Sequence, residues 1–271
     1  MNELEERSLN VRRDVVKMLG MARSGNLSSS LAAVDILVWL YGAVLDVQPK
    51  RPLFEERDRF VLSHKAAAPA LYAVLAERGF FRKDELWDYR RLGSMLQTFP
   101  EYRRTPGVDV SCGASGMGLG IALGLALALR ARGSHARVFC LTGSMEMGLG
   151  STWETFEALD SVSSSVAITL ILKREVARNG AASVSAQGLE APLLKRLELL
   201  GWPVIQADGH DMAEMGQALS SLPISSPGVL LLHTLAGKGI PSLEASFPCA
   251  EQALDRQTTE RLLGELEGAA L

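Results

Sequence analysis

Stretches with apolar residues at helical spacing alternate along the chain with short runs that are apolar throughout. The first pattern predicts a helix with one buried face, and the second predicts a strand that is covered on both sides. The spacing predicts a helix that Pro69 starts and Gly79 ends, and further helices over 9–22, 30–44, 82–92, 193–200, 212–222 and 258–266. The apolar runs predict strands over 59–62, 138–141, 166–172, 203–207 and 228–233.

This alternation predicts an α/β fold, a doubly wound, mostly parallel sheet with helices on both faces. Right-handed crossovers then bring the loops that follow the strands to one edge of the sheet. At 271 residues the chain can form one sizeable core. We expect a single domain over residues 1–245 and a C-terminal surface extension over 246–271.

Composition excludes two kinds of partner. The net charge of −3 gives no basic surface for nucleic acid. The longest apolar candidate, Leu119 to Leu129, is about half of the ~20 residues that span a bilayer, so it predicts a buried core helix and no membrane contact. The charged N-terminus has no secretory pattern, and three separated cysteines match no zinc or redox spacing. We therefore expect a cytoplasmic protein.

Three single residues invite a catalytic interpretation. Cys112 is either a reactive thiol or a small buried hydrophobe, and the second is expected because no basic group adjoins it in sequence. His210 and His233 are either catalytic or structural histidines, whose hydrogen bonds are satisfied in the core or in a turn. The structural role is again expected.

The stretch "LTGSMEMGLG", residues 141–150, predicts a strand, a glycine-rich turn and a helix. Such junctions bind phosphate in α/β proteins. Here, however, Ser144 and Met145 stand where a metal-assisted phosphate site would have a carboxylate and a second glycine.

Several segments, in the same order and at the same spacing, resemble the N-terminal domain of transketolases over roughly residues 8–245. They are "SGN" at 24–26, "RDRFVLS" at 57–63, "AAPALYAVLAERG" at 67–79, "YRRTPGVDVSCGASGMGLGIALGLALAL" at 102–129, "DGHD" at 208–211 and "HTLAGKG" at 233–239. The resemblance implies the fold that binds the diphosphate of thiamine diphosphate (ThDP). It also implies one half of a split transketolase, whose partner is a separate pyrimidine-domain subunit and whose assembly is a homodimer or heterotetramer.

The sequence differs from the family at the positions that bind the metal ion. The family's Gly-Asp-Gly turn corresponds to Gly143-Ser144-Met145, and the Asn that follows about thirty residues later falls at about Arg174. A hydroxyl and a guanidinium cannot replace the two Mg²⁺ ligands. No metal site is therefore expected.

Other family site positions also differ. The family histidines correspond to Asn26, Ala66 and Phe99, and His64 lies two places early. The cofactor loop keeps glycines at Gly113 and Gly116 but has Ser115 between them. A glutamate that links paired active sites corresponds to Leu149.

Three functions remain open. The first is a non-catalytic subunit that has no catalytic residue. The isolated chain is then expected to bind no cofactor, and ThDP would bind only in a complex. In this case cofactor space is filled by Met145, Met147, Leu149 and Phe99. The second is an altered transferase component that binds a diphosphate or sugar phosphate without the metal, through His64, Lys65, Lys173 and Arg174. The third is an active split transketolase with shifted residues.

The basic residues also have a plain structural interpretation. Arg174 would pair with Glu146 or Glu175 to fill a polar hole, and Lys65 would be exposed to solvent.

Overall fold

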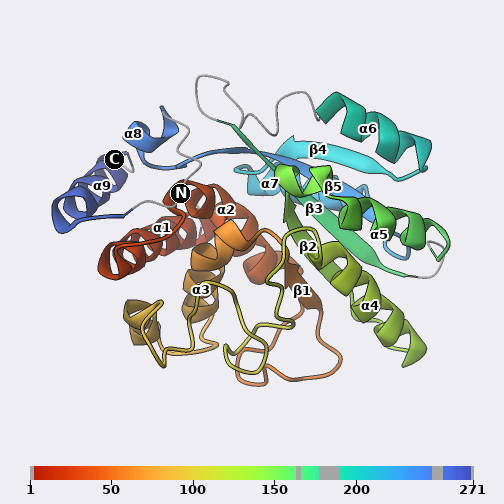
Figure 1. Ribbon diagram of the computed structural model, residues 1–271, viewed down its shortest axis with the longest axis horizontal. Helices are drawn as coiled ribbons and strands as arrows, with labels where there is room; N and C mark the ends of the chain where they lie inside the picture. Colours follow the sequence, from red (N-terminus) through yellow and green to blue (C-terminus); the bar gives the residue numbers. More distant parts are fainter. Residues whose placement is uncertain (1–2, 163–165, 177–189, 246–252, 270–271) are drawn as a thin grey trace.

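The computed structural model describes residues 3–162, 166–176, 190–245 and 253–269. Within these residues, five parallel strands form one sheet in the order β1-β2-β3-β5-β4 (Figure 1). The strands are β1 (Arg59–Leu62), β2 (Val138–Gly143), β3 (Ile168–Val176), β4 (Val204–Asp208) and β5 (Gly228–Leu235). The parallel sheet confirms the predicted fold class.

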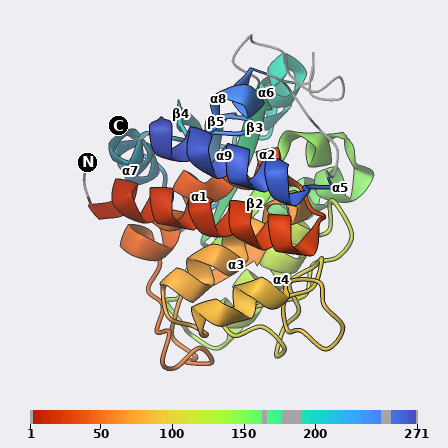
Figure 2. The same ribbon diagram turned by 90° about the vertical axis from the view of Figure 1, so that its left-hand side faces the viewer.

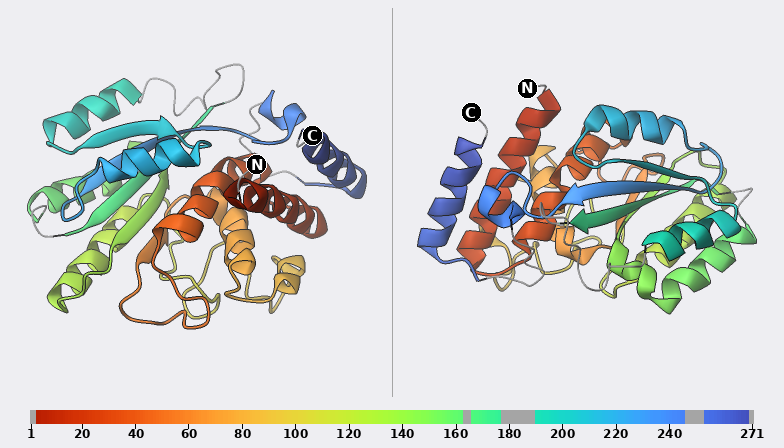
Figure 3. Two further views of the ribbon diagram at one scale, coloured as in Figure 1. Left: turned by 180° about the vertical axis from the view of Figure 1, so that it is seen from behind. Right: turned by 90° about the horizontal axis from the view of Figure 1, so that it is seen from above.

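Helices cover both faces of the sheet (Figures 1 and 3). The helices are α1 (Glu3–Ala22), α2 (Leu27–Trp39), α3 (Ala68–Glu77), α4 (Gly118–Ala131), α5 (Gly150–Asp160), α6 (Glu190–Leu199), α7 (Met212–Ser220), α8 (Pro241–Glu244) and α9 (Arg256–Gly268). One core cluster joins α1, α2, α3, α7 and α9 to the sheet, and a second joins α4, α5 and α6 to its other face. Alternate strand residues serve the two clusters, as Ile171 and Leu172 of β3 do.

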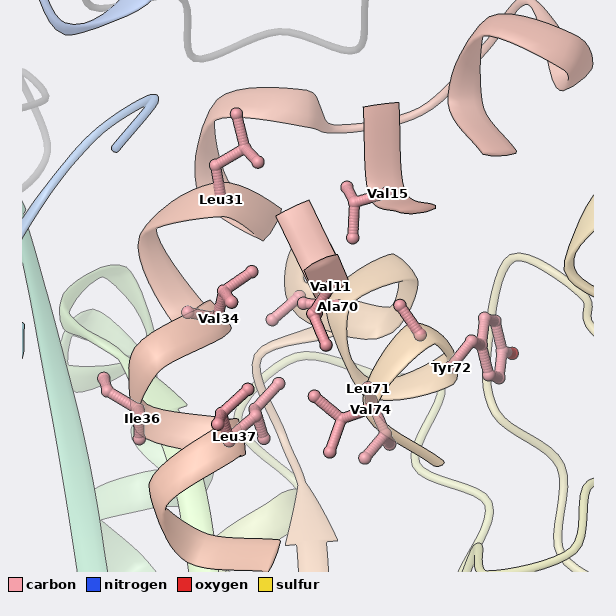
Figure 4. Close-up of a cluster of buried hydrophobic side chains, with 14 of the residues drawn as sticks. Val11, Val15, Leu31, Val34, Ile36, Leu37, Ala70, Leu71, Tyr72 and Val74 are labelled. Atoms are coloured by element: carbon pink, nitrogen blue, oxygen red, sulfur yellow. The ribbon is translucent and has the colours of Figure 1, made fainter. Parts of the chain in front are cut away.

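Part of the larger cluster lies where α1, α2 and α3 meet (Figure 4). Val11 and Val15 of α1, Leu37 of α2 and Val74 of α3 are all fully buried there. Helix α9 lies along the outer side of α1 (Figure 2) and buries Leu262 and Leu266 in the same cluster. This part of the expected surface extension therefore packs on the domain, whereas residues 246–252, including Cys249, lie outside the described part.

The predicted helix over residues 82–92 is wrong. Only Lys83–Asp88 form a short 3-10 helix, and Arg90 has a left-handed backbone with φ of 63°. A left-handed residue cannot continue a right-handed helix, and Gly93, with φ of 86°, turns the chain again. The apolar spacing arises because Leu86 in the short 3-10 helix and Tyr89 just after it are both buried.

Two expectations about apolar helices also need correction. Among the described residues, the 18-residue stretch Leu27–Val44 is long and apolar enough, by length and composition, to cross a membrane. However, 78% of it is buried inside the protein, as in the core helix of a globular domain. Helix α4, expected to be a core helix, buries only one face, and Leu127 on its other face is 36% exposed.

Candidate functional site

A cavity of about 420 Å³ opens where β1, β2 and β3 end. The walls come from the start of α2, the segment after β1, the glycine loop before α4, the turn after β2, and the end of β3. The lining residues are Asn26, Ser29, Ser63, His64, Lys65, Ala66, Ser115, Gly143, Ser144, Met145, Glu146, Leu149, Lys173 and Glu175. The position follows from the parallel sheet, whose carboxyl edge is where doubly wound proteins bind ligands.

Glu146 holds three of these walls together. Its Oε1 accepts hydrogen bonds from Ser63 Oγ at 2.6 Å and from the backbone N–H of Gly116 at 2.9 Å. Its Oε2 accepts from Thr142 Oγ1 at 2.8 Å and from the backbone N–H of Gly143 at 2.9 Å. Four donors thus satisfy a carboxylate that is 4% exposed. Sequence reasoning assigned Glu146 no such role, although a lone acidic residue in an otherwise uncharged turn was a usable signal.

A second polar cluster lies on β3. Lys173 has a fully buried side chain, and its Nζ donates to Glu175 Oε2 at 2.5 Å and to the Ser29 carbonyl at 3.4 Å. The Ser29 hydroxyl donates to the same Glu175 oxygen at 2.7 Å. Burial acts to raise the pKa of Glu175, but the Lys173 ammonium outweighs it and holds that pKa below its ordinary value. The cluster ties the end of β3 to the start of α2.

His64 lies between these two clusters. Burial, assisted by the charge of Lys173, lowers the pKa of His64 to about 4, so the ring is neutral at neutral pH. The ring packs so closely on Gly143 that an added Cβ would lie 2.5 Å from Nδ1, which explains the glycine at that position. The Nε2 atom is buried and has no hydrogen-bond partner among the described residues.

The structure brings most of the predicted site residues together. Those that line the cavity are Asn26, His64, Lys65, Ala66, Ser115, Gly143, Ser144, Met145, Leu149 and Lys173, whereas Phe99, Gly113, Gly116 and Arg174 do not. Gly116 contributes its N–H to Glu146 instead. Phe99 stays near the rim, where its ring centroid lies 5.5 Å from Lys65 Nζ. Lys65 is exposed, as its plain structural interpretation expected.

The prediction for Arg174 is wrong. Residues 173 and 175 of β3 both line the cavity, so strand alternation directs the side chain of 174 to the opposite face of the sheet. Lys173 makes the ion pair with Glu175 that was expected of Arg174. Glu146 is bonded to hydroxyl and backbone donors instead.

The prediction that apolar side chains fill the cofactor space is also wrong. Met145 is 58% exposed at the mouth of the cavity, and Leu149 and Phe99 are each 37% exposed. Met147 is buried, but in the core beneath α4 and α5. The cavity therefore remains open.

The other candidate residues have structural roles. Cys112 is 4% exposed, and burial raises the pKa of its thiol, which confirms the buried interpretation. His210 bonds through Nδ1 to Asp35 at 2.7 Å, and its Nε2 accepts from the backbone N–H of Leu235 at 2.8 Å. His233 bonds through Nε2 to Gln206 Oε1 at 2.9 Å. In the part of the chain that the structure describes, no group of three or more His, Cys, Asp or Glu side chains is placed to hold a metal ion.

The fold and the cavity define a doubly wound α/β protein with a ligand-sized site at the carboxyl edge of its sheet. Residues 5–263 match the family described as the thiamine diphosphate binding domain of transketolase, and the chain belongs to this family. The resemblance found in the sequence is thereby confirmed.

The similar proteins include single subunits of transketolases. The chain is 33% identical over 245 residues to one subunit of the apulose-4-phosphate transketolase of Actinobacillus succinogenes, covering 90% of this chain and 88% of that one. It is 29% identical over 269 residues to the 6-deoxy-6-sulfo-D-fructose transketolase subunit SqwG of a Clostridium species, covering 98% and 96%. The chain is thus a transketolase-like N-terminal subunit of the split type.

The crystal structure of the transketolase from Campylobacter jejuni superimposes with a TM-score of 0.84 at 26% identity. The match covers 97% of this chain but only 43% of that longer one. The same fold therefore occurs within a larger transketolase chain.

Proposed function

We propose that this subunit is a non-catalytic, structural or regulatory partner of a separate pyrimidine-domain subunit, and that it does not hold Mg²⁺ and ThDP in the usual way. The observation that carries the proposal is the buried Lys173–Glu175 ion pair in the cavity wall. The turn after β2 adds a serine and a methionine, Ser144 and Met145, at the cavity mouth.

The donor set of the cavity does not fit a magnesium ion. Mg²⁺ requires near-octahedral oxygen ligands and binds proteins through carboxylates. The two carboxylates among the described lining residues are already engaged, Glu146 by four donors and Glu175 by Lys173 and Ser29. A divalent cation beside Glu175 would also be repelled by the buried ammonium of Lys173. No step through ThDP is therefore assigned to this chain.

Assembly is the role that remains for the domain. Relatives that are named as single subunits of a transketolase imply a second, separately encoded subunit. Helix α4 offers a glycine-rich, partly apolar surface for association, since Gly124 and Leu127 are exposed and Met117 before the helix is 48% exposed. We propose self-association through residues 116–129, which gives a homodimer or, with the partner, a heterotetramer in the cytoplasm.

A second candidate function is favoured by the open cavity. An altered transferase component would use this space, about 420 Å³, for a diphosphate or sugar phosphate without the usual metal. Because Arg174 faces the other side of the sheet, Lys173 and Lys65 are the lysines that line this space in the described part of the chain.

The test is to co-express this chain with the pyrimidine-domain chain encoded nearest to it. We expect one stable complex in sedimentation experiments, with no transketolase turnover when Mg²⁺ and ThDP are supplied. Leu127→Glu on α4 should weaken self-association, whereas Lys195→Glu, a charge change on the exposed face of α6, should not. Turnover by the complex, or separate migration of the two chains at all concentrations, would contradict the proposal.

A further inference from the structure

We propose that a second cavity, at the amino edge of the sheet, binds a small molecule that carries a carboxylate on an apolar body. The cavity measures about 540 Å³, which falls in the range of small-molecule sites. It lies where β2 and β3 begin, and Phe139, Ile168 and Thr169 of these strands line it. None of its described lining residues belongs to the cavity at the carboxyl edge, so the two cavities are separate.

The walls of this second cavity are mostly apolar. Trp39 at the end of α2, Phe139 of β2 and Leu222 after α7 are buried core side chains that contribute to them. Ile224 lines the cavity as well, although it is 84% exposed. Transfer of apolar surface out of water is favourable, so a hydrocarbon body that covers these side chains is stabilised here.

The chain winds irregularly where it forms one of these walls. Helix α2 passes directly into a π-helical turn over Leu40–Val44, and Ala43 and Val44 of this turn line the cavity. π-Helical turns are rare, and they occur frequently at functional sites. The Val44 carbonyl at the end of the turn accepts a hydrogen bond from Arg137 Nη2 at 2.6 Å, so the turn and the arginine are held together.

Arg137 supplies the charge. Among the described residues that line the cavity, it alone carries a charged side chain. Its Nη2 and Nε donate to Asp58 Oδ2 at 2.6 and 3.2 Å, and its guanidinium lies over the Phe139 ring, 5.1 Å from the centroid. These contacts orient the guanidinium before any ligand arrives. Its Nη1, with two N–H donors, makes no hydrogen bond to a described residue, so it is able to donate to a carboxylate.

The charges around Arg137 suit an anionic head group. The Asp58 carboxylate is already satisfied, because it also accepts from the backbone N–H groups of Asp46 at 3.0 Å and of Arg137 at 2.8 Å. An adjoining cavity of about 470 Å³ shares Arg137 with the first and is lined by the exposed side chains of Arg130 and His135. Basic groups thus adjoin one cavity and apolar walls form the other, which favours a ligand with an anionic head and an apolar body.

The experiment is calorimetric titration of the full chain at pH 7 with three probes, octanoate, 1-octanol and acetate. We expect saturable binding of octanoate and about fivefold weaker binding, or less, of 1-octanol, which lacks the charge. Acetate, which lacks the apolar body, should show no saturable binding. Arg137→Met should lower the affinity for octanoate to that for 1-octanol and leave 1-octanol binding unchanged.

A second variant tests the location without changing the arginine. Gly216 of α7 lines the cavity, and a Cβ added there meets nothing within 4 Å. Gly216→Leu should therefore occupy the space of the ligand and weaken octanoate binding roughly tenfold or more. Gly264→Leu on α9, where an added Cβ also meets nothing within 4 Å, is the matched control and should leave the affinity unchanged.

Two results in the parent chain overturn the proposal: no saturable binding of octanoate, or equal affinity for octanoate and 1-octanol. Unchanged octanoate binding by Gly216→Leu places the ligand elsewhere and overturns it too. If Arg137→Met does not fold, Gly216→Leu and the comparison of octanoate with 1-octanol decide. The titrations contain neither Mg²⁺ nor ThDP, so either result leaves the proposed assembly role as it stands.

Discussion

Replacement of Glu146 by glutamine should destabilise the domain although the side chain keeps its size. The carboxylate accepts four hydrogen bonds, and each oxygen receives one from a hydroxyl and one from a backbone N–H. A hydroxyl can turn and accept from the new NH₂ group, but a backbone N–H cannot. Whichever way the amide points, either Gly116 or Gly143 is left with a buried, unpaired N–H.

An unpaired buried donor costs about 1–3 kcal/mol, and the loss of hydrogen bonds to a charged acceptor adds to it, so we expect a total of about 2–3 kcal/mol. For a domain of this size the loss corresponds to a decrease in Tm of roughly 4–12 °C. The assay is a thermal melt at fixed protein concentration, so that association does not alter the comparison. Glu154→Gln, on the exposed face of α5, is the control and should shift the free energy of unfolding by no more than about 0.5 kcal/mol. A Tm for Glu146→Gln equal to that of the control would refute the role assigned to Glu146.

Three further predictions concern other parts of the molecule. Gly118→Ala should destabilise the domain by about 1–3 kcal/mol, because its added Cβ would lie 2.2 Å from Ser63 Cβ. Gly264→Ala in α9, where nothing lies within 4 Å of the added Cβ, should be neutral or stabilising by up to about 1 kcal/mol. Urea unfolding distinguishes the two variants, and equal shifts would be contrary to the packing described. Arg12 and His210 overcome the effect of burial and hold the pKa of the Asp35 carboxyl well below its usual range, so Asp35→Asn should cost about 3–5 kcal/mol at pH 7. A carboxyl whose pKa is lowered in the folded state stabilises that state at pH values above its unfolded pKa, which is about 4. The difference in urea midpoint between parent and variant should therefore close only below a pH of about 4. A difference that closes between pH 7 and 5 would exclude this linkage. Burial raises the thiol pKa of both Cys112 and Cys140, so iodoacetamide at pH 8 should leave their peptides unmodified in the native protein, and rapid labelling of Cys112 would revive the reactive interpretation.

The sequence predicted the sheet well because its strands are apolar on both faces, and few other structures tolerate such runs. It placed the end of β3 four residues too early, since Lys173, Arg174 and Glu175 interrupt the apolar run, although backbone pairing with β5 continues to Val176. That difference decides which basic residue faces the cavity. The order of residues alone could not assign the faces, because a shift of one residue reverses every side chain of a strand.

The site was predicted in composition but not in its contacts. The turn at Gly143–Met145 and the neighbouring His64 were recognised, and the structure brings them to one cavity. The bonds of Glu146 link residues up to 83 positions apart, so no local pattern announces them. The expectation that Met145 and Phe99 fill the cavity failed because side-chain exposure depends on the whole surrounding surface rather than on residue type.

The central claim, that this subunit does not bind Mg²⁺ and ThDP in the usual way, is tested most directly by isothermal titration of ThDP with Mg²⁺. The titration is made first into the chain alone and then into its complex with the pyrimidine-domain subunit. We predict a stable complex. It should show no magnesium-dependent binding of ThDP at sites formed by this chain. Saturable, magnesium-dependent binding at micromolar ThDP, abolished by EDTA, would contradict it.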